Sequence, residues 1–231
     1  MNRFITNSIR FFLDSCLPPI IRDNKYFMYP LFYIWFKGKN IKKIMDFKSR
    51  AFSMTKEEMA EFYQNRDSLA TDRPTDLNEP SINYILRRFD TDAKTVLDVG
   101  CGNGYFINKV KSLGYEAWGC DMMPEIKLKN FHYVKADIEN LPFEDKAFDI
   151  VTCNHTLEHI VNLDQAISEL KRVAKKQLII VVPCQRYYYY TLDEHIWFFP
   201  YQQLLEHIIN LEVFTCQKIW GDWVYIGRIK S

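Results

Sequence analysis

The chain has 231 residues, of which 48% are hydrophobic and 26% are charged, which is the composition of a globular protein with a substantial core. Its net charge is +1, yet residues 1–50 carry ten Lys and Arg against three Asp and Glu, while the remainder carries twenty against twenty-six. This asymmetry predicts a basic N-terminal arm that meets an anionic surface, and the near-neutral total disfavours nucleic acid as a partner.

The first zone, residues 1–50, is predicted to be a basic and aromatic arm. Its longest uncharged aromatic stretch, residues 26–36, has eleven residues and contains Pro30, whereas a helix needs about 20 residues to span a bilayer. Interleaved basic and aromatic residues are typical of a helix in the membrane interface. We therefore expect peripheral membrane contact through residues 1–45, with the alternative that the arm packs on the catalytic domain or on a dimer partner.

The second zone, residues 51–91, is predicted to be a helical cap that contributes to the substrate pocket. One helix is expected to start at Thr55, in the sequence Thr-Lys-Glu-Glu, and a second to run from Pro80 toward Phe89. Between them, residues 70–79 form a polar linker.

From Thr95 onward, short apolar runs alternate with amphipathic helical patterns. We predict strands at 95–99, 116–120, 132–134, 148–153, 177–182, 213–219 and 224–229, the last two as an antiparallel pair, and helices at 105–113, 163–173 and 201–209. This alternation predicts an α/β protein with a Rossmann-like, seven-stranded, mostly parallel sheet, helices on both faces and an N-terminal helical extension. Residues 92–231 would form the catalytic domain.

Six cysteines are scattered along the chain without any C-x-x-C pair. Four of them lie at or near the ends of predicted strands. This placement favours reduced thiols in the cytoplasm over a disulfide framework. We expect the protein to be cytoplasmic, at the inner face of the membrane if its arm makes membrane contact.

The most informative stretch is the turn after the first strand, where Gly100, Gly102 and Gly104 alternate with other residues before a helix begins. Glycines allow a backbone to turn sharply and to lie against a ligand, and ligands in such sheets sit at the carboxyl ends of strands. A dinucleotide fingerprint would read G-x-G-x-x-G, but here the third glycine comes one residue early and Tyr105 follows it. No Gly-Lys-Ser/Thr of a P-loop is present.

The sequence Asp98-x-Gly100-x-Gly102-x-Gly104 resembles motif I of the class I S-adenosylmethionine-dependent methyltransferases, of the type 11 subgroup. The resemblance implies S-adenosyl-L-methionine as cofactor, with Asp98 near its cationic end. Asp121, 23 residues after Asp98, would accept bonds from the two ribose hydroxyls, and Met122 would pack on the adenine.

Two later motifs extend this resemblance. Asp137 and Ile138 resemble the next motif of the family, in which the Asp takes the adenine amino group. Residues 148–159 resemble the fourth strand and its loop, which implies that Asn154 lies beside the methionine part of the cofactor.

No Asn/Asp-Pro-Pro-Tyr/Phe motif follows the strand at 148–153, which favours carbon or oxygen acceptors over amino groups. Of these we predict oxygen, on a small-molecule acceptor. His155, His159 and His195 are the candidate catalytic residues, with His159 or His195 preferred as proton acceptor. Residues 186–190, Arg-Tyr-Tyr-Tyr-Tyr, and the N-terminal helices are expected to line the acceptor pocket.

We predict no metal, but one arrangement of residues offers a hypothesis of metal-aided transfer. His155-x-x-Glu158-His159 together with His195 resembles the Glu-x-x-Glu-His set, with a distant His, of some metal-aided O-methyltransferases. Residues at i, i+3 and i+4 share one face of a helix, so the spacing suits a divalent ion.

Residues 17–25, Leu-Pro-Pro-Ile-Ile-Arg-Asp-Asn-Lys, resemble the start of methyltransferases encoded with bacterial cell-surface polysaccharide genes. The sequence thus predicts methyl transfer to a small-molecule, glycan or lipid-linked acceptor, in polysaccharide biosynthesis. Two alternatives stay open: an NAD(P)-dependent reductase with a Rossmann fold, and a non-catalytic cofactor-binding subunit.

Overall fold

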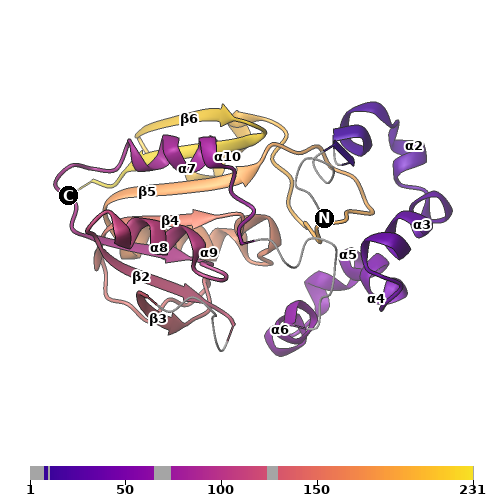
Figure 1. Cartoon of the computed structure of the whole chain (residues 1–231), viewed down its shortest axis with the longest axis horizontal. Helices are drawn as coiled ribbons and strands as arrows, with labels where there is room; N and C mark the ends of the chain where they lie inside the picture. Colours follow the sequence, from indigo (N-terminus) through magenta and orange to yellow (C-terminus); the bar gives the residue numbers. More distant parts are fainter. Residues whose placement is uncertain (1–7, 10, 65–73, 124–129, 231) are drawn as a thin grey trace. The chain divides into compact units, whose positions relative to one another are not determined.

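The computed structural model describes residues 8–9, 11–64, 74–123 and 130–230, and Figure 1 shows its ribbon. The chain divides into two compact units. The helical unit comprises Met1–Arg73 and Gln185–Phe198, and the sheet unit comprises Pro74–Cys184 and Phe199–Ser231.

This division differs from the predicted boundaries after residues 50 and 91. Residues 1–50 and 51–73 belong to one unit, while the helix predicted from Pro80 belongs to the sheet unit. The segment 185–198, expected inside the catalytic domain, belongs to the helical unit. The linker predicted at 70–79 lies partly outside the described residues.

The sheet unit contains seven strands in the order β3-β2-β1-β4-β5-β7-β6. All neighbouring pairs from β3 to β5 are parallel, and β7 pairs antiparallel with both β5 and β6. In chain order its elements are α7 (Glu79–Leu86), β1 (Thr95–Val99), α8 (Tyr105–Ser112), β2 (Glu116–Asp121), β3 (His132–Lys135), β4 (Phe148–Asn154), η3 (Leu157–His159), α9 (Leu163–Val173), β5 (Ala174–Pro183), α10 (Gln202–Ile209), β6 (Val213–Ile219) and β7 (Asp222–Arg228). The predicted mostly parallel, Rossmann-like sheet is confirmed.

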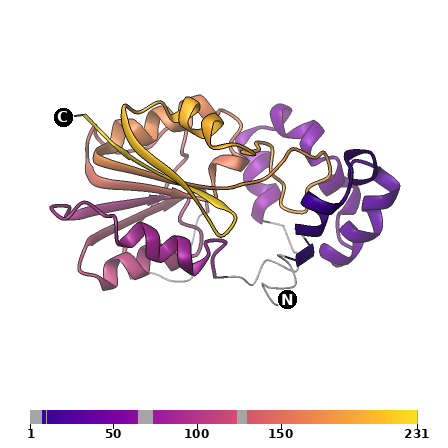
Figure 2. The ribbon, with the colours of Figure 1, turned by 90° about the horizontal axis from the view of Figure 1, so that it is seen from above.

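Helices cover both faces of this sheet, as Figure 2 shows, with α7 and α8 on one face and α9 and α10 on the other. The central strands β1, β4 and β5 are apolar runs because neither of their faces meets water. The buried side chains between α7, α8 and the sheet include Ile82, Ile85, Phe106, Ile107, Val110, Val96, Ile150, Ile179 and Val181.

The helical unit is built from short helices and the segment 185–198. Its elements are η1 (Phe12–Cys16), α2 (Pro19–Arg22), α3 (Lys25–Trp35), α4 (Ile41–Met45), α5 (Phe47–Arg50), η2 (Ala51–Ser53) and α6 (Lys56–Gln64). The predicted start of α6 is confirmed by a capping box, in which the Thr55 N–H donates to Glu58 and the Glu58 N–H donates to the Thr55 hydroxyl. Within the described ranges, no helix is both long and apolar enough to cross a membrane.

The segment 185–198 is fastened to the start of the chain by hydrogen bonds and by the unit's core. The Arg22 guanidinium donates to the Tyr187 carbonyl at 2.7 Å, and Lys48 Nζ donates to the Tyr188 carbonyl at 2.6 Å. Leu192 is buried in one cluster with Met28, Phe32, Trp35, Phe36 and Ile44. The segment therefore completes the core of the helical unit.

Candidate functional site

The glycine turn at residues 100–104 joins β1 to α8 and folds against the end of β2. The N–H groups of Gly100 and Cys101 both donate to the Cys120 carbonyl, at 2.8 and 3.1 Å. Gly100, Gly102 and Gly104 have φ values of +74°, +52° and +80°, in the left-handed region that residues with a Cβ rarely adopt. The turn lies at the carboxyl edge of the sheet, where this fold binds ligands.

Two of these glycines are needed for different reasons. A Cβ on Gly100 would lie 2.2 Å from Thr156 Oγ1, so the loop after β4 leaves no room for a side chain there. A Cβ on Gly102 would meet nothing within 4 Å. Open space beside exposed backbone is what a cofactor lying against the turn would require.

The Asp121 carboxylate, at the end of β2, points to the glycine turn. Its Oδ2 accepts the Gly102 N–H at 2.9 Å and its Oδ1 accepts the Met123 N–H at 3.1 Å. Met122 is half-buried beside it. The predicted ribose-binding carboxylate thus lies at the turn and is held by backbone donors.

Asp98 is buried beneath the same turn, with 2% of its surface exposed. Its Oδ1 accepts the Thr152 hydroxyl at 2.6 Å and the Asn154 amide at 2.9 Å. Burial raises the pKa of Asp98 to about 7; the bonds from Thr152 and Asn154 oppose this shift and the negative charge of Asp121 adds to it. A bound cation near this carboxyl would favour its ionised form.

Asn154 carries a buried acceptor at the site. While its amide nitrogen donates to Asp98, its Oδ1 is buried and has no hydrogen-bond partner in the part of the chain that the structure describes. Such an unpaired acceptor is unfavourable in a folded protein unless a ligand donates to it. The pair of Asp98 and Asn154 therefore fits the cationic methionine end of S-adenosylmethionine.

Asp137 and Ile138 follow β3, which is paired with β2, at the same edge. Asp137 Oδ1 accepts the Glu139 N–H at 2.9 Å, and Ile138 is 5% exposed. Their assignment to the adenine stays a prediction.

His155 lies between two carboxylates directly after β4. Its Nδ1 is 3.3 Å from Glu158 Oε1, and its Nε2 is 3.4 Å from Asp222 Oδ2. Burial favours the neutral ring, but the combined effect of Asp222 and Glu158 outweighs it and raises the pKa of His155 well above its ordinary value. A protonated imidazole cannot accept a proton or bind a metal, which disfavours both predicted roles for His155.

Asp222 extends this network across the sheet unit. Its Oδ2 also accepts the Asn78 side-chain amide at 2.6 Å, and Asn78 Oδ1 in turn accepts the Ser81 N–H as the N-cap of α7. These contacts thus connect the loop after β4 with the first residues of β7 and of α7. Sequence reasoning missed Asp222 and Asn78, because the β6–β7 hairpin brings Asp222 to His155 from a distant position and Asn78 reaches the network only through Asp222.

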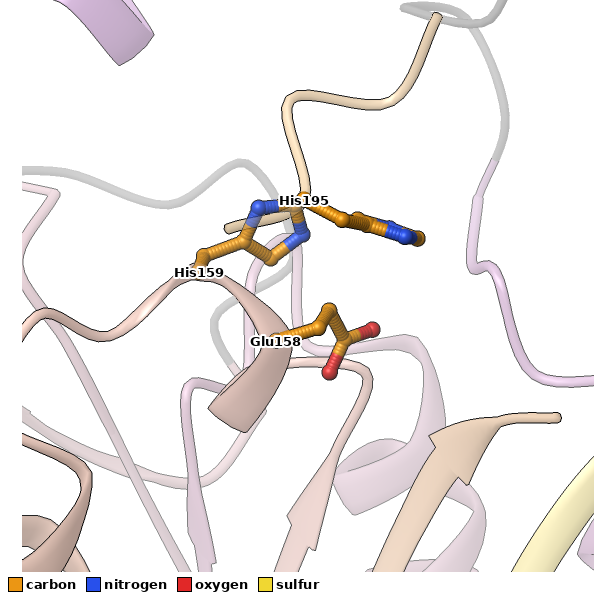
Figure 3. Close-up of side chains that lie close together, drawn as sticks. All are labelled: Glu158, His159 and His195. Carbon is orange, nitrogen blue, oxygen red and sulfur yellow. The ribbon is translucent and has the colours of Figure 1, made fainter. Parts of the chain in front are cut away.

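The remaining predicted catalytic residues lie on two different parts of the chain, which Figure 3 shows. Glu158 and His159 are on the single 3-10 turn η3; Glu158 is buried and His159 is half-buried. His195 lies in the segment 185–198, where its Nδ1 is 2.7 Å from Gln185 Oε1. The hypothesis of a metal held by these residues stays a prediction.

Residues 97–182 match the family model described as "Methyltransferase domain". This range contains the glycine turn, Asp121, Asp137 and Asn154. The match includes the candidate cofactor site and excludes the helical unit.

Two curated relatives match part of the chain. A malonyl-(acyl-carrier protein) O-methyltransferase of Buchnera aphidicola subsp. Baizongia pistaciae is 35% identical over 106 residues, 43% of this chain and 43% of that protein. A ubiquinone biosynthesis O-methyltransferase of Xanthomonas oryzae pv. oryzae is 32% identical over 110 residues, 43% of this chain and 46% of that protein. The chain spans less than half the length of these relatives.

Among solved structures, the PH0226 protein of Pyrococcus horikoshii OT3 is similar to 74% of this chain over 99% of its own length. The TM-score is 0.56 and the sequence identity is 19%, so this likeness shows the shared fold alone.

Proposed function

We propose that this protein is an S-adenosylmethionine-dependent methyltransferase that methylates an oxygen of a small-molecule, glycan or lipid-linked acceptor. The premise is the methyltransferase-domain match over residues 97–182. The observation that carries the proposal is the arrangement of Asp98, the glycine turn and Asp121 at one edge of the sheet.

The residues of this edge divide the work of holding the cofactor. The open backbone at Gly102 and the carboxylate of Asp121 would hold the ribose, while Asp98 and Asn154 would hold the methionine end. S-adenosylmethionine, when bound, supplies a methyl group on an electrophilic sulfonium. The protein's own task is to align the acceptor with that methyl and to exclude water.

An alcohol acceptor needs a group that takes its proton. His159 and His195 are the candidates, because His155 is held protonated between Glu158 and Asp222. Both relatives named above are O-methyltransferases, which supports oxygen as the acceptor atom. The resemblance at residues 17–25 supports an acceptor in polysaccharide biosynthesis, and six free cysteines support a cytoplasmic protein.

Cofactor binding is tested by calorimetric titration of the full chain with S-adenosylmethionine, S-adenosylhomocysteine, NADH and NADPH. We expect micromolar binding of the first two and none of the nicotinamides. Asp121→Asn should weaken S-adenosylhomocysteine at least tenfold, while Asp164→Asn, on the exposed side of α9, should leave it unchanged. Binding of NADPH instead would replace the proposal with a reductase.

Activity is tested by transfer of labelled methyl from the cofactor into fractionated cell extract. Label is expected in the glycan or lipid fraction, and His159→Gln should lower the rate at least tenfold without weakening cofactor binding. Cofactor binding with no label in any fraction would indicate a non-catalytic subunit. Loss of activity on metal removal, restored by a divalent ion, would establish the metal hypothesis.

A further inference from the structure

Helix α3 exposes apolar side chains on the side opposite its buried face. Met28, Phe32 and Trp35 are buried in the core of the helical unit. The outer face of α3 consists of Tyr26 (89% exposed), Phe27 (40%), Tyr29 (45%), Tyr33 (54%) and Ile34 (65%). A helix that is apolar all round is normally buried or meets a membrane, because water offers no gain to its outer side.

The two elements that precede α3 also expose apolar side chains. Ile20, in α2, is 83% exposed, and Phe12, in η1, is 53% exposed. Single exposed hydrophobic residues are ordinary, but their concentration on three consecutive elements marks an interaction site.

Positive charge accompanies this surface. Lys25, the first residue of α3, is exposed and lies 3.9 Å from the Asp46 carboxylate. Helix α4, which packs against α3, carries exposed Lys42 and Lys43 on the side opposite its buried residues. Residues 1–50 carry ten Lys and Arg against three acidic residues, whereas the rest of the chain is net negative. The charge complements an anionic surface.

We propose that the outer face of α3, with the exposed residues of α2 and η1, docks on an anionic membrane interface. With eleven residues, α3 is too short to cross a bilayer, so it would lie in the plane of the interface. Its three exposed tyrosines suit this position, because their rings enter the apolar boundary while their hydroxyls stay among the headgroups. The excess of lysine and arginine over acidic residues in residues 1–50 supplies the positive charge that anionic headgroups attract.

A second copy of the chain fits this surface less well than a membrane does. Residues 1–50 carry ten Lys and Arg against three acidic residues, so pairing two copies through the helical unit would bring two net positive charges together, and like charges repel. Protein interfaces are also depleted of lysine at their centres. This inference does not depend on methyl transfer, since it rests on the helical unit alone.

The test is flotation of the full-length protein with vesicles of phosphatidylcholine alone or with 30% phosphatidylglycerol. We expect at least tenfold tighter binding to the anionic vesicles, weakened by salt. The triple variant Tyr26→Ser/Tyr33→Ser/Ile34→Ser should lower binding at least tenfold. Its matched control, Tyr201→Ser/Val213→Ser/Trp220→Ser, removes residues that are 69%, 58% and 83% exposed in the sheet unit and should bind like the wild type.

Charge is tested separately with Lys42→Gln/Lys43→Gln, which should reduce binding to anionic vesicles by about fivefold per lysine. The control Lys111→Gln/Lys175→Gln removes two exposed lysines of the sheet unit and should have no effect. Wild-type protein that stays unbound to both vesicles would overturn the proposal. So would a concentration-dependent dimer, measured by light scattering, that the triple variant abolishes, because the face would then be an interface between copies.

Discussion

Helices α3 and α9 each have eleven residues and each bury one face in the core of their unit. They differ on the opposite side. The exposed residues of α9 are Asp164, Gln165 and Ser168, all polar, whereas the outer face of α3 exposes three tyrosines, a phenylalanine and an isoleucine. A helix whose outer side meets water is usually polar there, and the apolar outer face of α3 is the feature that the membrane proposal explains.

The largest expected effect on stability comes from removing the buried charge of His155 in the sheet unit. His155→Gln leaves Glu158 and Asp222 without the imidazolium between them, and breaking a buried ion pair costs about 4 kcal/mol of the free energy of unfolding. The control His207→Gln, at an exposed position of α10, should change the free energy of unfolding by less than about 0.5 kcal/mol. Urea unfolding measures both.

The pH dependence of this effect has a definite sign. Because the folded pKa of His155 lies well above 6.5, its contribution is fully present below pH 6.5 and is lost only as the pH rises through that raised value. The difference between wild type and His155→Gln should therefore persist from pH 6 to pH 8. A difference that disappears by pH 7 would contradict the assigned charge state.

Truncating one side chain in α9 and one in α3 compares what each contributes to the free energy of unfolding. Leu170→Ala, at a fully buried position of α9, should lower the free energy of unfolding by about 3 kcal/mol. Ile34→Ala, on the outer face of α3, should change it by less than about 0.5 kcal/mol, because Ile34 is 65% exposed. A large loss from Ile34→Ala, measured by urea unfolding, would break the comparison by showing that the outer face of α3 stabilises the fold.

Two residues of the glycine turn have different roles. Gly100 is required by the packing of the loop after β4, whereas Gly102 leaves space for a ligand. Gly100→Ala brings a Cβ against Thr156 and should lower stability by about 2 kcal/mol more than Gly102→Ala, whose Cβ meets open space. Gly102→Ala should still weaken S-adenosylhomocysteine at least tenfold, because the new methyl group occupies the ligand's side of the turn. Thermal unfolding and calorimetric titration measure the two effects; unchanged affinity in Gly102→Ala would place the cofactor elsewhere.

A further expected effect is the pH titration of Asp98. Its folded pKa, about 7, lies above the ordinary 3.8, so its contribution to stability decreases as the pH rises from about 4 to about 7. Asp98→Asn removes this decrease, and the variant should gain stability relative to wild type between pH 5 and pH 8. Cofactor binding to the wild type should strengthen over the same range, because binding favours the carboxylate. Parallel pH profiles of the two proteins would contradict this assignment.

The sheet and the glycine turn could be predicted because the sequence patterns that specify them are contiguous along the chain. A buried parallel strand is an apolar run, and Gly100, Gly102 and Gly104 follow one directly. Asp121 was predictable from its spacing to Asp98 and lies at the turn as expected. The carboxyl ends of parallel strands share one edge, so sequence order was enough to bring these residues together.

Other features could not be predicted because they depend on contacts between distant segments. Asp222 reaches His155 only through the register of the β6–β7 hairpin against β5. The assignment of residues 185–198 to the helical unit depends on Leu192 entering a core formed by residues near the start of the chain. Neither contact leaves a periodic pattern in the sequence.

Residues 185–198 leave the sheet unit and join the helical unit, and this has a consequence for synthesis on the ribosome. Residues 1–64 emerge first, but their hydrophobic cluster lacks Leu192 until more than a hundred further residues have been translated. The aromatic side chains of the helices in residues 11–64 therefore stay partly exposed until residues 185–198 have been synthesised. Shortening the protein from its N-terminus would in turn leave residues 185–198 without the partners that order them.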